Sequence, residues 1–351
     1  MTIAERPIAI YYEHREWFRP LFAELDRRGL PYEALRADEL IVDPAHGLAG
    51  EYSLFVNRMS PSAWDRGRGG AVFETVHHLA GLEAQGTAVF NGSKAYGLDI
   101  SKVQQASLLE RLGLNTPRTR VVYSADRLVA AAASLTYPIL VKPNMGGNGA
   151  GVERFVSPDE LQLAVELGAL RAGPDGVLLV QEYHAPKERS IVRAETLDGK
   201  FLYAIRIHLP EACSFSLCPA DLQHTTSGQT LEATARKDDE GNDAAVEAYT
   251  PPQEVIAEIE AIAKAGGLDV GGMEYLESER DGQRHYYDIN ALSNFVADAE
   301  KVIGFDPTAR LVDALEARLR STAPRIPFIH TPLESGALPQ SALAAPEQAA
   351  A

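Results

Sequence analysis

The sequence predicts an α/β fold that continues into an α+β region, and two observations support this class. Residues 7–100 alternate strand-like apolar runs with helical segments, which is typical of a small, largely parallel sheet. Beyond residue 136, strand-like runs are joined by glycine-rich or Asp-Gly turns, which are typical of antiparallel hairpins. We therefore expect a parallel N-terminal sheet followed by sheets built from hairpins.

The first hundred residues contain four expected strands and two expected helices. The strands fall at 7–12, 31–36, 52–59 and 87–92, and the helices at 16–29 and 74–86. A polar, glycine-rich loop at 61–70 follows the third strand, which is where open α/β sheets place ligand-binding groups. We expect two cations of this region, Arg58 and Arg66, to contact the substrate.

The rest of the chain predicts more helices and several strand pairs. Helices are expected at 101–113, 126–135 and 251–266, and a further helix opens at Ser157, with Pro158 at its first position and Glu160 reaching back to the cap. Strands are expected at 119–124, 137–143, 152–156 and 177–183, followed by hairpins at 188–208 and 271–295. We predict domains at 1–98, 99–180 and 181–325, and a disordered Ala- and Pro-rich tail at 326–351.

Charge and composition exclude several classes of partner. The 351 residues carry a formal net charge of −16, and counterion release on nucleic acid or an anionic membrane needs clustered Lys and Arg. The two cysteines, Cys213 and Cys218, lack the spacing of a zinc site or a disulfide framework. No stretch has the length of a signal peptide core or a membrane span. We expect a cytoplasmic protein without nucleic-acid or membrane partners.

The most unusual stretch is YPILVKPNMGGNGAG at 137–151. A Walker loop places its lysine after the glycines and opens a helix, whereas Lys142 precedes them and a strand follows. A dinucleotide fingerprint would need glycine at position 152, where the chain has Val152. A strand, a glycine loop and a second strand can instead cover a nucleotide with backbone N–H groups. An ordinary surface hairpin is the alternative.

Oxygen ligands gather near the end of the chain. Glu274, Asp288 and Asn290 are residues of the hard type that Mg²⁺ prefers, on two strands joined by a turn. A two-residue turn at Asp281 and Gly282 would pair Glu274 with Ile289 and separate the carboxylates. A three-residue loop, or an equivalent bulge, pairs Glu274 with Asp288, and we predict that register. Solvated acidic side chains are the alternative.

The ordered set of segments resembles the ATP-grasp superfamily, and within it the RimK-type and glutathione-synthetase-like ligases. The resemblance covers about residues 50–320. It is carried by NGSKAYGLDISKVQQASLLERLGLNTPRT, YPILVKPNMGGNGAGV, VLLVQEYH and GGMEYLESERDGQRHYYDINALSNF, in that order. It implies ATP and two Mg²⁺ ions, with Mn²⁺ possible, as cofactors.

The resemblance also implies roles for individual residues. Lys102 and Lys142 would contact the ATP phosphates under the glycine loop, and Glu188 would bind the ribose. Glu274, Asp288 and Asn290 would hold the metal ions, and Arg193 and Arg206 would face the acceptor carboxylate and its phosphorylated form. The loop residues are Gly146, Gly147, Asn148 and Gly149, and the residues along the adenine, with strand backbone groups reading its edge, are Gln181, Glu182 and Tyr183.

The two arginines lie on a hairpin whose turn is Asp198 and Gly199. A two-residue turn pairs Leu197 with Lys200, and a regular ladder then points Arg193 and Arg206 to one face. We predict that both enter one pocket. A plain salt bridge on a hairpin is the alternative.

Two departures from the RimK pattern affect the substrate. RimK-type enzymes usually show Asp and then Glu-x-Asn, whereas this chain has Glu274 and then Asp-x-Asn. The usual Ser-Pro-Gly loop after the asparagine is replaced by residues 291–295, which include Asn294, an expected substrate contact.

The function predicted is a ligase that activates a small carboxylate as an acyl phosphate and joins it to an amine, in a homo-oligomer such as a dimer or tetramer. A non-catalytic ATP-binding regulator and a ligase with another nucleophile are the alternatives.

Overall fold

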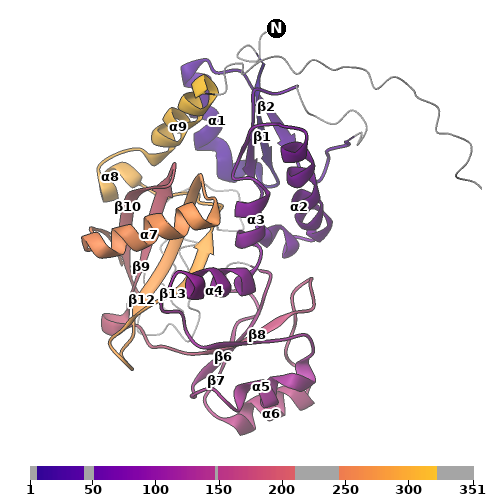
Figure 1. Ribbon diagram of the computed structural model, residues 1–351, viewed down its shortest axis with the longest axis vertical. Helices are drawn as coiled ribbons and strands as arrows, with labels where there is room; N and C mark the ends of the chain where they lie inside the picture. Colours follow the sequence, from indigo (N-terminus) through magenta and orange to yellow (C-terminus); the bar gives the residue numbers. More distant parts are fainter. Residues whose placement is uncertain (1–5, 43–50, 147–148, 210–244, 322–351) are drawn as a thin grey trace, which may run out of the picture.

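The computed structural model describes residues 6–42, 51–146, 149–209 and 245–321. Its strands form three sheets, which follow one another along the long axis of the molecule, with the N-terminal sheet at the top of Figure 1 and the sheet of β5–β8 at the bottom. The predicted tail at 326–351 and both cysteines lie outside the described residues. No helix in the described ranges is long and apolar enough to cross a bilayer.

The N-terminal sheet is parallel, as predicted. Its strands β1 (Ile8–Tyr12), β2 (Tyr32–Arg36), β3 (Leu54–Arg58) and β4 (Val89–Phe90) run in the order β2-β1-β3-β4. Helices α1 (Arg19–Arg28), α2 (Gly69–Ala84) and α3 (Ser93–Asp99) connect or follow these strands. Helix α1 ends where Gly29 takes a φ of 65°, a conformation that favours glycine.

The second sheet is antiparallel and contains the glycine-rich hairpin. Strands β5 (Thr119–Val122), β6 (Ile139–Pro143), β7 (Glu153–Phe155) and β8 (Leu178–Glu182) run in the order β5-β8-β6-β7. Strands β6 and β7 pair antiparallel across the glycine loop, so the predicted hairpin is confirmed. Helices α5 (Leu128–Ala132) and α6 (Pro158–Glu166) lie on the same side of this sheet in Figure 1. The Ser157 hydroxyl caps α6 by accepting from the Glu160 amide.

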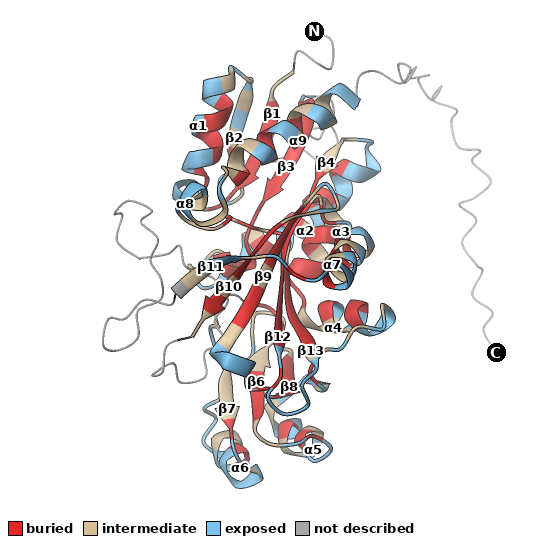
Figure 2. Ribbon diagram, turned by 90° about the vertical axis from the view of Figure 1, so that its left-hand side faces the viewer, coloured by how far each residue is buried: buried red, intermediate tan, exposed pale blue. Residues whose placement is uncertain are grey.

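The third sheet has five antiparallel strands and is buried along most of its length (Figure 2). Strands β9 (Ser190–Leu197), β10 (Lys200–His208), β11 (Ala245–Tyr249), β12 (Val270–Glu277) and β13 (Arg284–Asn290) run in the order β11-β10-β9-β12-β13. Helix α7 (Gln253–Gly266) covers one face, where Val255, Ile259 and Ile262 join an apolar core with the strands. Helix α4 (Lys102–Arg111) adds Leu108 and Leu109 to that core.

The chain finally returns to the N-terminal sheet. After α8 (Ala299–Ile303), helix α9 (Pro307–Ser321) lies beside α1 (Figure 1). Leu311, Val312 and Leu315 of α9 are buried in the same core as Ile8 and Leu25. The sequence patterns above did not predict α3, β11, α8 or α9. The predicted domain boundaries stay predictions.

Candidate functional site

The two predicted metal-binding carboxylates face each other across strands β12 and β13. Glu274 pairs with Asp288, while Tyr275 pairs with Tyr286, so Tyr287 forms a β-bulge. The hairpin loop is longer than three residues, because the Ser278 amide donates to the Gln283 carbonyl at 2.8 Å. The longer loop and the bulge compensate each other. The predicted pairing of Glu274 with Asp288 is therefore confirmed, and the bulge produces it.

The carboxylate pair is deeply buried, and each carboxylate has one ion pair, Asp288 with Lys102 and Glu274 with Arg193. Glu274 is 0% exposed, and its Oε2 makes no hydrogen bond with any described residue. Burial raises the pKa of Glu274, and the facing Asp288 raises it further. Burial alone would raise the pKa of Asp288 as well, but Lys102, Lys142 and Asn290 together hold that pKa below its usual range. The amide nitrogen of Asn290 donates to Asp288 Oδ2 at 3.3 Å, so the Asn290 side chain lies beside the pair. Two carboxylates and a side-chain amide are the residue types that suit Mg²⁺.

Two lysines from other elements approach this pair. Lys102 is the first residue of α4, whose N-cap Ser101 accepts from the Gln104 amide, and its ammonium pairs with Asp288. Lys142 on β6 donates to Gln181 Oε1 of β8 at 2.8 Å. Burial, and after it the charge of Lys102, lower the pKa of Lys142 to about 8. Two close ammonium groups in a buried place indicate a site for a polyanion.

Arg193 lies on β9 next to the carboxylate pair. Its Nε donates to Glu195 Oε1 at 2.6 Å, and its Nη1 donates to Glu274 Oε1 at 2.9 Å. Glu195 was not among the residues predicted from the sequence. The sequence offered one signal for Glu195, its position two residues after Arg193 on a strand, because residues two apart on a strand share a face.

The prediction that Arg206 shares a pocket with Arg193 is wrong. The turn is as expected, with Leu197 opposite Lys200, but β10 contains an irregularity between Phe201 and Tyr203. The extra residue shifts the register by one, so Arg206 pairs with Val192 and Arg193 pairs with Ile205. Because neighbours along a strand point to opposite faces, Arg206 projects from the face that α7 covers. No catalytic role is assigned to it below.

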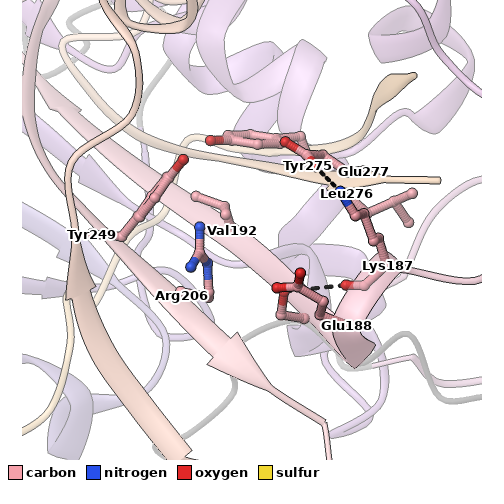
Figure 3. Close-up of a pocket in the computed structure, with 9 residues that line it drawn as sticks. Lys187, Glu188, Val192, Arg206, Tyr249, Tyr275, Leu276 and Glu277 are labelled. Atoms are coloured by element: carbon pink, nitrogen blue, oxygen red, sulfur yellow. Dashed lines mark hydrogen bonds and ion pairs between the residues drawn. The ribbon is translucent and has the colours of Figure 1, made fainter. Parts of the chain in front are cut away.

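Glu188 lines the same hollow as Arg206, not the site of the carboxylate pair. Both residues line a hollow on the α7 face of the third sheet (Figure 3). Glu188 lies just before β9 with a φ of 53°. The ribose contact of Glu188 stays a prediction.

The stretch predicted to follow adenine is largely buried within the second sheet. Gln181 accepts from Lys142 and donates to the Thr119 hydroxyl at 2.8 Å. The amides of Glu182 and Tyr183 already donate to backbone carbonyls, each at 2.9 Å. These two amides are thus already used within the sheet, and the prediction that other backbone groups of this stretch read the adenine edge stays a prediction. The Glu182 side chain accepts from Arg118 and from the Thr136 amide.

The glycine loop is described in part. Gly146 and Gly149 are described, and Gly149 has a φ of 68°, whereas Gly147 and Asn148 lie outside the described residues. The loop joins β6, which carries Lys142, to β7.

The predicted substrate residues occupy different surroundings. Arg58 is buried, lies over the Phe18 ring at 5.3 Å and donates to the Ser293 carbonyl. Asn294 directly follows Ser293, so it lies in the loop that Arg58 contacts. Arg66 pairs with Glu13 within the N-terminal domain and stacks on Trp17 at 4.6 Å. Arg58 and Asn294 thus lie where the N-terminal sheet meets the end of β13, and Arg66 is held by Glu13.

A histidine group at the other end of β13 was not predicted from the sequence. His184, Asp281 and His285 offer potential ligand atoms within 4.8 Å of one another. Existing hydrogen bonds join His184 Nδ1 to the Ser278 hydroxyl at 2.9 Å and His285 Nε2 to Asp281 at 3.0 Å. These bonds tie the end of β8 to the β12–β13 hairpin. No sequence spacing linked His184 to the other two residues.

Comparisons with known proteins agree with this architecture. Residues 101–192 match the family described as "Carbamoyl-phosphate synthase L chain, ATP binding domain". The chain is 32% identical over 166 residues to formate-dependent phosphoribosylglycinamide formyltransferase of Synechococcus sp. (strain RCC307), covering 45% of this chain and 41% of that protein. It is 29% identical over 166 residues to D-alanine–D-alanine ligase of Ectopseudomonas mendocina (strain ymp), covering 45% and 50%. The chain spans about half the length of these curated relatives or less.

Similarity to solved structures extends over nearly the whole chain. The ATP-grasp ligase PsnB, solved with a phosphomimetic variant of its minimal precursor, Mg and ADP, superposes with a TM-score of 0.62 at 20% sequence identity, covering 89% of this chain and 98% of that one. The chain therefore has the ATP-grasp fold. The resemblance seen in the sequence is confirmed at the level of the fold.

Proposed function

We propose that the protein is an ATP-dependent ligase that activates a carboxylate as an acyl phosphate and joins it to an amine, with release of ADP and phosphate. The convergence of Glu274, Asp288 and Asn290 with Lys102 and Lys142 carries this proposal, because separate segments bring metal-type ligands and phosphate-type cations together. The matched ATP-binding domain over 101–192 includes both lysines. A relative named as a D-alanine–D-alanine ligase supports a carboxylate and an amine as substrates.

The residues of the site divide into three roles. Glu274, Asp288 and Asn290 would hold Mg²⁺, as two ions or with Mn²⁺ in its place. Such a metal would neutralise charge on the β- and γ-phosphates. Lys102 and Lys142 bind the phosphates, under the loop that contains Gly146 and Gly149. Gln181, Glu182 and Tyr183 line the adenine end through side chains and carbonyls.

The chemistry needs positioning and charge more than a protein nucleophile. A carboxylate oxygen of the substrate bonds to the γ-phosphorus as the bond to the β-phosphate oxygen breaks, and ADP leaves. The amine nitrogen then bonds to the acyl carbon, the carbon–oxygen bond to phosphate breaks, and the amine loses a proton. Arg193 lies beside Glu274, where its guanidinium can bind the acceptor carboxylate and then the acyl phosphate. Arg58 and Asn294 bind the substrates from the N-terminal side.

The test is turnover with defined pools. The protein is mixed with Mg²⁺, ATP and pools of amino acids and small carboxylates, and ADP release is followed. We expect release that depends on a carboxylate and an amine together and that falls at least 100-fold in Glu274→Ala and Asn290→Ala. Glu254→Ala, an exposed carboxylate on α7, is the control and should retain turnover.

Two results would reject the proposal. ATP binding without turnover in any pool would indicate a regulator, and turnover without an amine would indicate another nucleophile. The homo-oligomer and the cytoplasmic location stay predictions, and light scattering on a sizing column measures the former.

A further inference from the structure

A hollow lies on the face of the third sheet that α7 covers. The hollow is separate from the carboxylate pair, although residues that line the hollow are sequence neighbours of residues at the pair. Val192 directly precedes Arg193, and Tyr275 directly follows Glu274, so these side chains point to opposite faces of the same strands. Figure 3 shows the hollow. Its lining residues are Lys187, Glu188, Ser190, Val192, Arg206, Tyr249, Tyr275, Leu276 and Glu277.

Arg206 provides a cation within the hollow. Its guanidinium carbon lies 4.2 Å from the centroid of the Tyr249 ring. Stacking on a ring uses the flat face of a guanidinium and leaves its N–H edge available. The carboxylate nearest to it, Glu247, is 3.8 Å away and 56% exposed, and such exposed pairs are weak. Arg206 can therefore accept an anionic ligand.

Tyr275 provides an unused hydroxyl. The residue is 3% exposed, and its hydroxyl makes no hydrogen bond of normal geometry with a described residue. The Tyr249 hydroxyl is near enough to contribute to the raised pKa of Tyr275, after burial, but it does not complete such a bond. A buried hydroxyl without a well-formed hydrogen bond is costly. A ligand in the hollow would recover that cost.

Glu188 provides the opposite charge. Its carboxylate is directed toward the hollow in Figure 3, and within the described ranges it makes no ion pair, with Arg206 or with any other residue. Lys187 and Glu277 are paired at 3.9 Å and are both exposed. The lining of the hollow therefore holds a cation, Arg206, and an anion, Glu188, that no ion pair joins to each other.

We infer that this hollow binds a free α-amino acid, with its carboxylate on Arg206 and the Tyr275 hydroxyl and its ammonium on Glu188. A simple anion such as phosphate would leave Glu188 uncompensated beside it, whereas a zwitterion satisfies both charges. The site is independent of the proposed ligase reaction.

Calorimetry on the full-length protein tests the inference without requiring turnover. Alanine, leucine, phenylalanine and glutamate are titrated in excess Mg²⁺ and ADP, each beside its amide and its N-acetyl derivative. At least one amino acid should bind at micromolar to millimolar concentration. Its amide, which lacks the carboxylate, and its N-acetyl form, which lacks the ammonium, should each bind at least 10-fold more weakly.

Variants identify the site. Arg206→Gln and Glu188→Gln should weaken binding at least 10-fold. Tyr275→Phe, which removes only the unpartnered hydroxyl, should weaken it about threefold in a protein that remains folded. Arg120→Gln, at an exposed position on β5 outside the hollow, should bind as before. The inference is overturned if no amino acid binds at 10 mM, if the capped forms bind equally, if Arg206→Gln and Tyr275→Phe bind normally, or if Mg²⁺ and ADP displace the amino acid.

Discussion

Arg193 occupies its position because Gly272, two residues before Glu274 on the neighbouring strand β12, has no side chain. A Cβ placed on Gly272 would lie 2.6 Å from Arg193 Nη2 and 2.9 Å from Glu195 Oε1. The guanidinium thus crosses over Gly272 on its way to Glu274. Gly272 pairs with Glu195 on one side and with Asn290 on the other. The backbone of β12 therefore provides the space in which the arginine sits.

Gly272→Ala should displace Arg193 without unfolding the chain. Both clashing groups are ends of side chains, which can move, so the cost in stability should stay within the usual 1–3 kcal/mol of overpacking. A displacement of about 1 Å in a catalytic group lowers rates by about 100-fold. We expect kcat/KM for ADP release to fall by about that factor, with the melting temperature measured on the same samples.

Gly81→Ala is the matched control, because a Cβ on Gly81 in α2 meets nothing within 4 Å. It should keep wild-type turnover. Normal kcat/KM in folded Gly272→Ala would show that Arg193 does not need its observed position.

At the scale of single residues, the sequence was sufficient to predict the oxygen ligands and the two lysines as candidates. Few types of side chain bind Mg²⁺ or phosphate, so residue type leaves few candidates for these roles. Glu195 could not be singled out in this way, because acidic residues are common in a chain with a net charge of −16. Its role depends on contacts that only the folded sheet creates.

At the scale of elements, the two hairpins show where the alternation of side chains along a strand predicts the face of a residue correctly and where it does not. Both turns contain Asp-Gly, and both hairpins contain an irregularity that shifts the register by one residue. For β12–β13, a bulge was one of the two arrangements predicted. For β9–β10 the turn was right, but nothing in the sequence KFLYAIR marks the extra residue near Leu202, so Arg206 was assigned to the wrong face.

The contact between β8 and the β12–β13 hairpin should make stability depend on pH. Burial, then His285 and Arg280, lowers the pKa of His184 to about 4 from 6.5, a difference worth about 3 kcal/mol. Between pH 6.5 and 4, His184 therefore binds a proton more readily in the unfolded chain than in the folded chain. The contribution of His184 to the free energy of unfolding is therefore fully present above pH 6.5. It should be lost as the pH falls toward 4, as measured by urea unfolding.

His184→Asn removes the titrating group and keeps a polar side chain near Ser278. Its free energy of unfolding should change less between pH 6.5 and 4 than that of the wild type, by about 3 kcal/mol. His77→Asn, at an exposed position on α2, should follow the wild-type curve. Parallel curves for His184→Asn and the wild type would contradict the argument.

At the scale of the whole molecule, the last described helix completes the first domain. Arg28 of α1 donates to Asp313 Oδ1 at 2.7 Å and to the Ala309 carbonyl at 2.9 Å. Beneath these bonds, Leu311, Val312 and Leu315 are at most 2% exposed. The N-terminal core is therefore built from both ends of the described chain. The sequence patterns gave no indication of this contact, because periodicity predicts a helix and its apolar face but not the partner of that face.

Ending the chain after Asp306 should destabilise the N-terminal domain and with it the whole protein. Burial of Leu311, Val312 and Leu315 contributes about 1.5–3 kcal/mol each, so their loss removes about 5–9 kcal/mol from a typical total of about 5–15 kcal/mol. We expect the shortened chain to be aggregated or largely unfolded at 25 °C, as judged by circular dichroism and sizing chromatography. A chain ending at Ser321 keeps α9 and is the control. If the chain ending at Asp306 melted cooperatively within a few degrees of that control, α9 would not be part of the N-terminal core in solution.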